Sequence, residues 1–260
     1  MMRLSPTNKN RLVDLISELH YSPIMPRLTK HYLGCYVDDK LVGGLTFGWG
    51  TRPKHTIQKM FPELDTQDYF EIGKMALVEE MPRNSESQML KLAIQWLREN
   101  TDIKYLFTWA DGIVGKPGYV YQAANFLYGG YNLTDTYVTA DGEKVHPRTM
   151  QGRMPKKEGL KMNPRPTPEQ LKEMGISRVK GKQFKYIYPM NKKWRRYLKE
   201  STTEWTLNYP KHKDLSWQIK KPGEEKYTQT NEIPFDLSRE MVYNKQHNKN
   251  NKNNLEEFFV

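Results

Sequence analysis

Side chains able to act as acids, bases or metal ligands stand at the ends of predicted helices and strands. His20 and Tyr21 close a first predicted helix, and Glu71 lies within a predicted strand. Asp111 directly follows a second apolar strand, and Tyr121 comes ten residues later. An imidazole, carboxylates and a phenol at neighbouring element ends suit general acid–base catalysis.

Each of these groups also has a structural explanation when it is taken alone. Asp111 and Gly112 together are typical of a turn, and Glu71 can pair on the surface with Lys74. A further polar run, Asn84-Ser85-Glu86-Ser87, opens a predicted helix. Serine is a good N-cap there, and the backbone N–H groups at a helix start also favour an anion.

A mixed α/β sheet must position these groups. Apolar spacing predicts helices over residues 6–20, 85–99 and 118–128, strands over 31–37, 41–47, 69–78 and 105–109, and a hairpin around 140–142. Gly43 and Gly44 within the second strand indicate a bulge or a close approach of backbones. This order favours a mixed, centrally antiparallel sheet flanked by helices and disfavours a helical bundle.

Basic residues dominate the segment between residues 145 and 200. This segment contains sixteen Lys or Arg residues and only four acidic residues. A short helix over 167–175 and a strand over 184–188 are predicted there. Residues 192–197 alternate cations with aromatic rings, which suits phosphates and stacked bases, and a solvated basic helix face is the alternative. The predicted DNA-contacting residues are Arg148, Lys192, Lys193, Trp194, Arg195 and Arg196.

Composition limits the class of protein. A net charge of +11 over 260 residues favours a polyanionic partner. The sequence has no apolar run near the roughly 20 residues that a membrane span needs, and no apolar secretion segment at the start. The single cysteine, Cys35, excludes an internal disulfide and a cysteine-cluster zinc site. Phosphate-binding P-loop and dinucleotide-binding sequences are absent. We therefore expect a cytoplasmic protein without a membrane partner.

Four segments are expected along the chain. Residues 1–145 form the predicted catalytic core, 146–200 a basic extension that contacts DNA, and 201–243 an irregular segment. Residues 244–260 begin with a run of Asn and Lys that is typical of a disordered linker. Leu255, Phe258 and Phe259 resemble the short peptides that dock on DNA sliding clamps. A terminal strand packed on the core is the alternative.

Seven short segments of the chain, taken together and in order, resemble those of a known protein family. They are His20-Tyr21-Ser22 with Met25-Pro26, Leu41-Val42-Gly43 with Phe47-Gly48, Glu71 through Leu77, Asn84-Ser85-Glu86-Ser87, Ala110-Asp111, Gly118 through Phe126, and His146-Pro147-Arg148. No single one is specific, but in this order they resemble the phage Mom family of DNA-modification proteins.

The resemblance implies a fold, an activity and a set of residues. The fold is that of the GNAT acetyltransferases, and the activity adds a small acetamide-like (methylcarbamoyl) group to N6 of adenine in phage DNA, which protects it from host restriction. It also implies a need for iron and a place in the host bacterial cytoplasm. The catalytic residues carried over are His20, Tyr21, Ser87, Asp111 and Tyr121.

Cofactor predictions rest on the same positions. Glu71, Asn84 and Ser85 are the predicted cofactor-binding residues, and His20 with Asp111 or Glu71 the predicted iron ligands. Residues 81–87 contain no glycine and carry Glu86, which argues against coenzyme A bound through its pyrophosphate in the usual GNAT mode. The donor of the transferred group is not identified. The loop 112–117 also lacks the histidine common in the family.

Two other functions fit parts of the sequence. One is a coenzyme A-dependent GNAT acyltransferase that acts on a small amine or a protein, which saturable coenzyme A binding would support. The other is a non-catalytic DNA-binding protein, which would leave the Mom-like core residues without a role.

Overall fold

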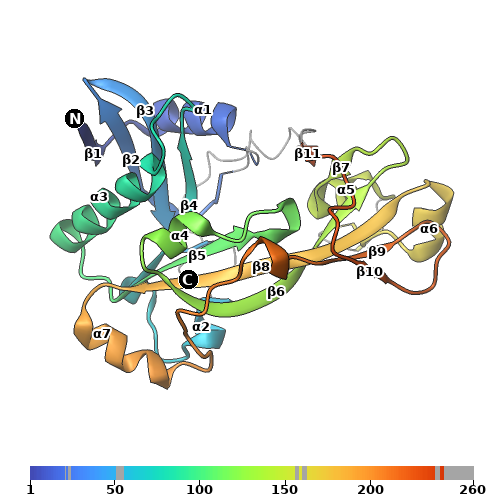
Figure 1. The fold of residues 1–260 in the computed structure, drawn as a ribbon. Helices are drawn as coiled ribbons and strands as arrows, with labels where there is room; N and C mark the ends of the chain where they lie inside the picture. Colours follow the sequence, from blue (N-terminus) through green and yellow to red (C-terminus); the bar gives the residue numbers. More distant parts are fainter. Residues whose placement is uncertain are drawn as a thin grey trace.

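One continuous mixed sheet organises the chain (Figure 1). The computed structural model describes residues 1–20, 22, 25–50, 56–155, 158–159, 163–237 and 241–242. In these residues the strand order is β1-β2-β3-β4-β5-β8-β6-β7-β11; off this path β9 pairs with β8, and β10 pairs with β9. The strands are β1 (Met2–Pro6), β2 (Thr29–Val37), β3 (Lys40–Gly48), β4 (Tyr69–Leu77), β5 (Tyr105–Asp111), β6 (Leu127–Val138), β7 (Lys144–Val145), β8 (Ser177–Pro189), β9 (Trp217–Lys220), β10 (Thr228–Thr230) and β11 (Met241–Val242).

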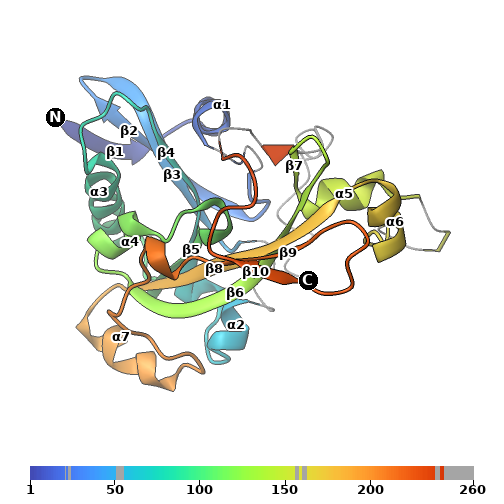
Figure 2. The same ribbon diagram turned by 45° about the vertical axis from the view of Figure 1, so that its right-hand side comes forward.

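Helices cover both faces of the amino-terminal half of this sheet. The α-helices are α1 (Lys9–Leu19), α2 (Ile57–Met60), α3 (Ser85–Asn100), α4 (Tyr119–Ala123), α5 (Pro147–Arg153), α6 (Pro168–Glu173) and α7 (Lys192–Arg196). Figure 2 shows α1 and α3 on opposite faces of β1 to β4. The predicted fold class, a mixed sheet flanked by helices, is confirmed. In the described residues, no helix is long and apolar enough to span a membrane.

The sheet opens between its two central strands. β4 and β5 run parallel and pair only over residues 69–71 and 105–107. Beyond that point β4 continues along β3, whereas β5 continues along β8. The carboxyl-terminal halves of β4 and β5 therefore diverge, and side chains at the fork lie between them.

Packing on this sheet follows the predicted apolar faces. α3 buries Met89, Leu90, Ala93, Ile94 and Leu97. Each of the Met, Leu and Ile side chains contributes about 1.5–3 kcal/mol when fully buried. The predicted close approach at the two strand glycines is also present. A Cβ on Gly43 would lie 2.3 Å from the carbonyl oxygen of Ala76, and one on Gly44 would lie 2.3 Å from that of Leu33.

Two predicted helices are shorter than expected. The first begins at Lys9, because residues 2–6 pair with β2 as β1 and the Asn8 side chain caps the helix. The helix predicted over 118–128 ends at Ala123. Asn125 takes a left-handed φ of 61°, and the chain then enters β6 at Leu127. The prediction from residue 124 onward was therefore wrong.

The sheet continues across the boundary predicted at residue 145. β8 lies between β5 and β6 and pairs with both along most of its length. The segment 201–243, predicted to be irregular, supplies β9, which pairs with β8. The predicted linker and the clamp-docking residues Leu255, Phe258 and Phe259 lie outside the described residues.

Candidate active site

Glu71 occupies the fork where β4 and β5 separate. Its carboxylate oxygen Oε2 accepts a hydrogen bond of 3.0 Å from Nε1 of Trp109 on β5. Gly50 approaches it closely, since a Cβ there would lie 2.5 Å from the same oxygen and the backbone has a φ of +68°. Burial raises the pKa of Glu71 to about 7, against the smaller lowering effect of the Trp109 bond. Glu71 can therefore hold or release a proton near neutral pH.

Asp111 ends β5 and faces two lysines. Its Oδ1 accepts a hydrogen bond of 3.0 Å from Nε2 of Gln183 on β8. Lys74 on β4 and Lys116 after the following turn both interact electrostatically with Asp111. Burial lowers the pKa of Lys74 to about 8, although Asp111 opposes that shift. Burial also lowers the pKa of Lys116. The site thus combines a carboxylate with amines that lose their protons more readily than free lysine.

His20 follows α1 and approaches the same lysines. Burial, with the charges of Lys74 and Lys116, lowers the pKa of His20 to about 3, so the ring is neutral at pH 7. Its Nδ1 accepts a hydrogen bond of 3.0 Å from the backbone N–H of Ser22. In a neutral ring the proton then lies on Nε2, which makes Nε2 a hydrogen-bond donor.

Tyr121 approaches the cluster from α4. Burial raises the pKa of Tyr121, a hydrogen bond with Thr108 lowers it, and the charges of Asp111 and Glu71 raise it further. The phenol is therefore neutral. Its ring packs against Tyr186, with ring centroids 5.7 Å apart.

A buried glutamine fixes the helix that carries Tyr121. Nε2 of Gln122 donates to the carbonyl oxygens of Pro117 and Pro210, at 3.2 and 3.0 Å, and lies 3.0 Å from the hydroxyl of Tyr186. Gly118 before α4 has a φ of +90°, and a Cβ there would lie 2.7 Å from the Tyr186 ring. The position of Tyr121 is thus set by the preceding loop and by neighbours on two distant segments.

The structure brings together four of the predicted residues and adds others. His20, Glu71, Asp111 and Tyr121 are linked through their shared electrostatic neighbours. The sequence did not identify the groups that complete the site, because most of them lie far along the chain from the group they contact and Lys74 had a simpler surface role. They are Lys74, Thr108, Trp109, Lys116 and Gln183.

The predicted residues at the start of α3 make local contacts. The hydroxyl of Ser87 donates to the carbonyl oxygen of Asn84 at 2.8 Å, and that of Ser85 donates to Pro82 at 2.7 Å. Asn84 has a left-handed φ of 70° and makes no side-chain cap. The catalytic role predicted for Ser87 and the cofactor role predicted for Asn84 and Ser85 stay predictions. Tyr21 lies outside the described residues.

The donors at the site do not fit a metal centre built on His20. A histidine that binds a metal through Nε2 normally donates a hydrogen bond from its other nitrogen, whereas Nδ1 of His20 accepts one. Lys74 and Lys116 also place positive charge beside Asp111. The described part of the chain holds no group of three or more His, Cys, Asp or Glu side chains suited to a metal ion. The need for iron stays a prediction.

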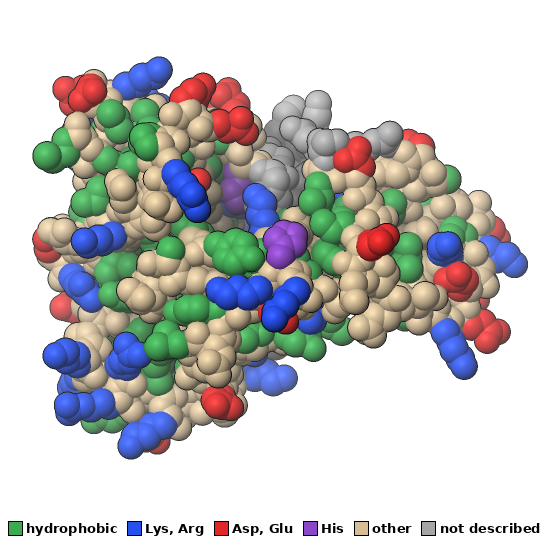
Figure 3. Space-filling view, in the orientation of Figure 1, with side chains coloured by type: hydrophobic (Ala, Val, Ile, Leu, Met, Phe, Trp, Pro, Cys, Tyr) green, Lys and Arg blue, Asp and Glu red, His purple; other side chains and the backbone are tan. Residues whose placement is uncertain are grey.

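The predicted DNA-contacting residues fall at opposite ends of the molecule. α7 carries Lys192, Lys193, Trp194, Arg195 and Arg196, and Figure 3 shows Lys and Arg side chains gathered at that end, at the lower left. Arg148 lies on α5 at the other end (Figure 1). The ring of Trp194 packs on Tyr105 and Tyr197, with centroids 6.3 and 5.8 Å away, so its aromatic face helps to anchor α7.

Solved structures similar to this chain include GNAT acetyltransferases. A GNAT family acetyltransferase from Elizabethkingia anophelis has 13% identity and a TM-score of 0.34, and the match covers 72% of this chain and 97% of that one. An N-acetyltransferase from Staphylococcus aureus has 13% identity and a TM-score of 0.38, with 73% and 98% covered.

A closer relative is known by sequence. The methylcarbamoylase Mom of Escherichia phage Mu is 33% identical over 137 residues, which cover 52% of this chain and 56% of that protein. The model of the Mom protein family matches residues 1–211. The chain therefore belongs to the Mom protein family.

Proposed function

We propose that this protein transfers a small acetamide-like (methylcarbamoyl) group to N6 of adenine in DNA and so protects phage DNA from restriction. The observation that carries the proposal is the cluster of His20, Glu71, Asp111 and Tyr121 at the fork of β4 and β5. Membership of the Mom family and the name of the phage Mu relative support the chemistry. The adenine must leave the base stack to reach a buried site of this kind.

We assign to Asp111 the role of accepting a proton from the N6 amine. Gln183 donates a hydrogen bond that orients one of its oxygens, and Lys74 and Lys116 interact electrostatically with the same side chain. The neutral phenol of Tyr121 can donate a hydrogen bond to the base, and the Nε2–H of His20 can donate one to the transferred group. In this assignment Asp111 is the general base, and the other groups orient the reactants.

Nucleoside analysis tests the activity directly. DNA from bacteria that express the protein is digested and its nucleosides are weighed by mass spectrometry. We expect a deoxyadenosine whose mass has increased by that of the acetamide-like group. Unmodified DNA in cells that contain folded protein would contradict the proposal and favour the coenzyme A-dependent acyltransferase. A different added mass would keep DNA modification and reject this group.

The exposed cations of α7 are expected to bind DNA phosphates. Replacing Lys192, Lys193, Arg195 and Arg196 by Ala should flatten the dependence of log Kd on log salt, by about 0.9 for each phosphate that the helix no longer neutralises. Fluorescence anisotropy with duplex DNA at several salt concentrations measures that slope. Removing the exposed Lys9, Arg11, Lys40 and Lys91 is the control of equal charge. An equal change in both variants would rule out a specific role for α7.

We further propose that the terminal peptide with Leu255, Phe258 and Phe259 docks on a DNA sliding clamp. A tether of this kind raises the local concentration of an enzyme at newly copied DNA. Deleting residues 250–260 should remove binding to a phage clamp and leave modification of plasmid DNA unchanged. Clamp binding that survives the deletion would contradict the docking role.

A further inference from the structure

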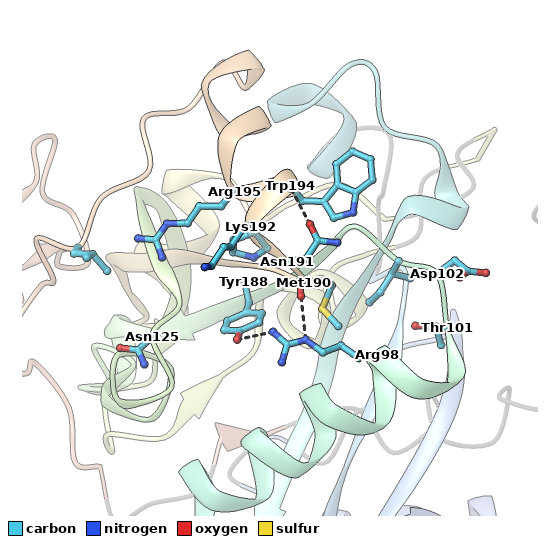
Figure 4. Close-up of a pocket in the computed structure, with 13 residues that line it drawn as sticks. Arg98, Thr101, Asp102, Asn125, Tyr188, Met190, Asn191, Lys192, Trp194 and Arg195 are labelled. Carbon is cyan, nitrogen blue, oxygen red and sulfur yellow. Dashed lines mark hydrogen bonds between the residues drawn. The ribbon is translucent and has the colours of Figure 1, made fainter.

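A cavity separate from the candidate active site lies between the end of α3, the end of β8 and α7 (Figure 4). Its volume is 910 Å³. Figure 4 shows Lys192 and Arg195 reaching it from α7, and Arg98 from α3 on the facing side. These three cations are accompanied by one acidic lining residue, Asp102. The excess of positive charge indicates an anionic ligand.

Arg98 is held in place for such a ligand. Its Nε donates to the carbonyl oxygen of Met190 at 3.0 Å, and its Nη2 donates to the hydroxyl of Tyr188 at 3.1 Å. A guanidinium has five N–H groups, so others remain for an anion. Because two bonds already orient the group, little side-chain entropy is lost when an oxyanion binds.

Amide side chains add neutral donors to the same cavity. The Oδ1 of Asn191 accepts the backbone N–H of Trp194 at 3.0 Å, which leaves its NH₂ group as the donor to a ligand. Asn125 also lines the cavity, four residues after Tyr121. Cations together with amides suit the phosphate and sugar oxygens of a nucleic-acid backbone.

The strand register gives the distance from this cavity to the active site. At the cavity end Tyr105 of β5 pairs with Pro189 of β8, and at the other end Asp111 pairs with Gln183. Six residue steps of a strand span about 20 Å, which corresponds to roughly six base pairs of duplex DNA. A duplex with its extruded adenine at Asp111 can therefore reach the cavity with its flanking backbone.

We propose that this cavity binds backbone phosphates of the substrate duplex about six base pairs to one side of the modified adenine. The inference rests on the proposed function for the position of the adenine, but binding of duplex DNA in the cavity can be measured without catalysis. Arg98, Lys192 and Arg195 supply the charge, while Asn125 and Asn191 bind the uncharged oxygens.

α7 itself provides a matched comparison. Lys192 and Arg195 line the cavity, whereas Lys193 and Arg196 lie on the same helix and do not line it. Replacing the lining pair by Ala should weaken duplex binding about tenfold more than replacing the other pair, because it removes two direct phosphate contacts. Anisotropy with an unmodified duplex measures both. Equal losses in the two double variants would overturn the proposal.

A cysteine crosslink tests the same contact by position. Leu207 lines the cavity and is 52% exposed, while Leu133 on β6 is equally exposed outside it. The native Cys35 is buried. A duplex whose backbone carries an activated disulfide about six base pairs from the adenine should crosslink Leu207→Cys and spare Leu133→Cys. The reverse result, or no preference, would overturn the proposal. Crosslinking without base modification would instead refute the proposed function and leave the DNA site standing.

Discussion

Replacing Asp111 by Asn should reduce adenine modification by about 100- to 10,000-fold, the range that a general base contributes. The substitution keeps an oxygen that can accept the bond from Gln183, so the fork of β4 and β5 should keep its geometry. What is lost is the proton acceptor and the charge that faces Lys74 and Lys116. Initial rates of modified deoxyadenosine formation on a defined duplex measure the effect.

Two controls separate catalysis from folding in this experiment. Asp14→Asn removes an exposed carboxylate from α1 and should leave the rate unchanged. Thermal unfolding of Asp111→Asn should remain cooperative, and duplex affinity should stay within a few fold of the original. If Asp111→Asn retained most of the activity, Asp111 would not be the general base, and Tyr121 would be the alternative proton acceptor.

Replacing Glu71 by Gln should stabilise the protein at pH 8 by up to about 3 kcal/mol, and much less at pH 5. Burial raises the pKa of Glu71 to about 7, from 4.5 in the unfolded chain. The native state therefore binds more protons than the unfolded state between these values, and wild-type stability falls as the pH rises through that window. Each pKa unit corresponds to about 1.36 kcal/mol.

Urea unfolding at several pH values measures this difference. Glutamine keeps an amide oxygen that can accept the bond from Trp109, so the comparison isolates the buried charge. Glu99→Gln, at an exposed position near the end of α3, is the control and should show no such pH dependence. If the difference in unfolding free energy between Glu71→Gln and wild type were the same at pH 5 and pH 8, Glu71 would not be a buried carboxylate with a raised pKa.

Local patterns predicted the elements that carry the site. The apolar face of α3, the hairpin of β2 and β3 and the strand before Asp111 all follow from spacing within a few residues. Asp111 was singled out because it directly follows a predicted strand, whereas the catalytic role predicted for Tyr121 came from the family resemblance. The family resemblance supplied the activity, which no spacing indicates.

The contacts that the sequence could not predict depend on pairing between strands that lie far apart along the chain. Gln183 reaches Asp111 because β8 pairs with β5, and Trp109 reaches Glu71 because β4 and β5 are neighbours. Lys74 was predicted to be a possible surface partner of Glu71. In the structure Lys74 is shielded from solvent and interacts electrostatically with Asp111 and His20. The helix predicted after Gly118 failed at Asn125, where tertiary pairing into β6 prevails over helical spacing.

The position of β8 has a consequence for how the chain folds during synthesis. β5 pairs on one side with β4 and on the other with β8, which follows it by more than sixty residues. Until β8 leaves the ribosome, the apolar Leu106 and Phe107 belong to an exposed edge strand. Such edges recruit other strands, and distant pairing is slow. We therefore expect the nascent chain to be most prone to aggregation in the interval between the synthesis of β5 and that of β8.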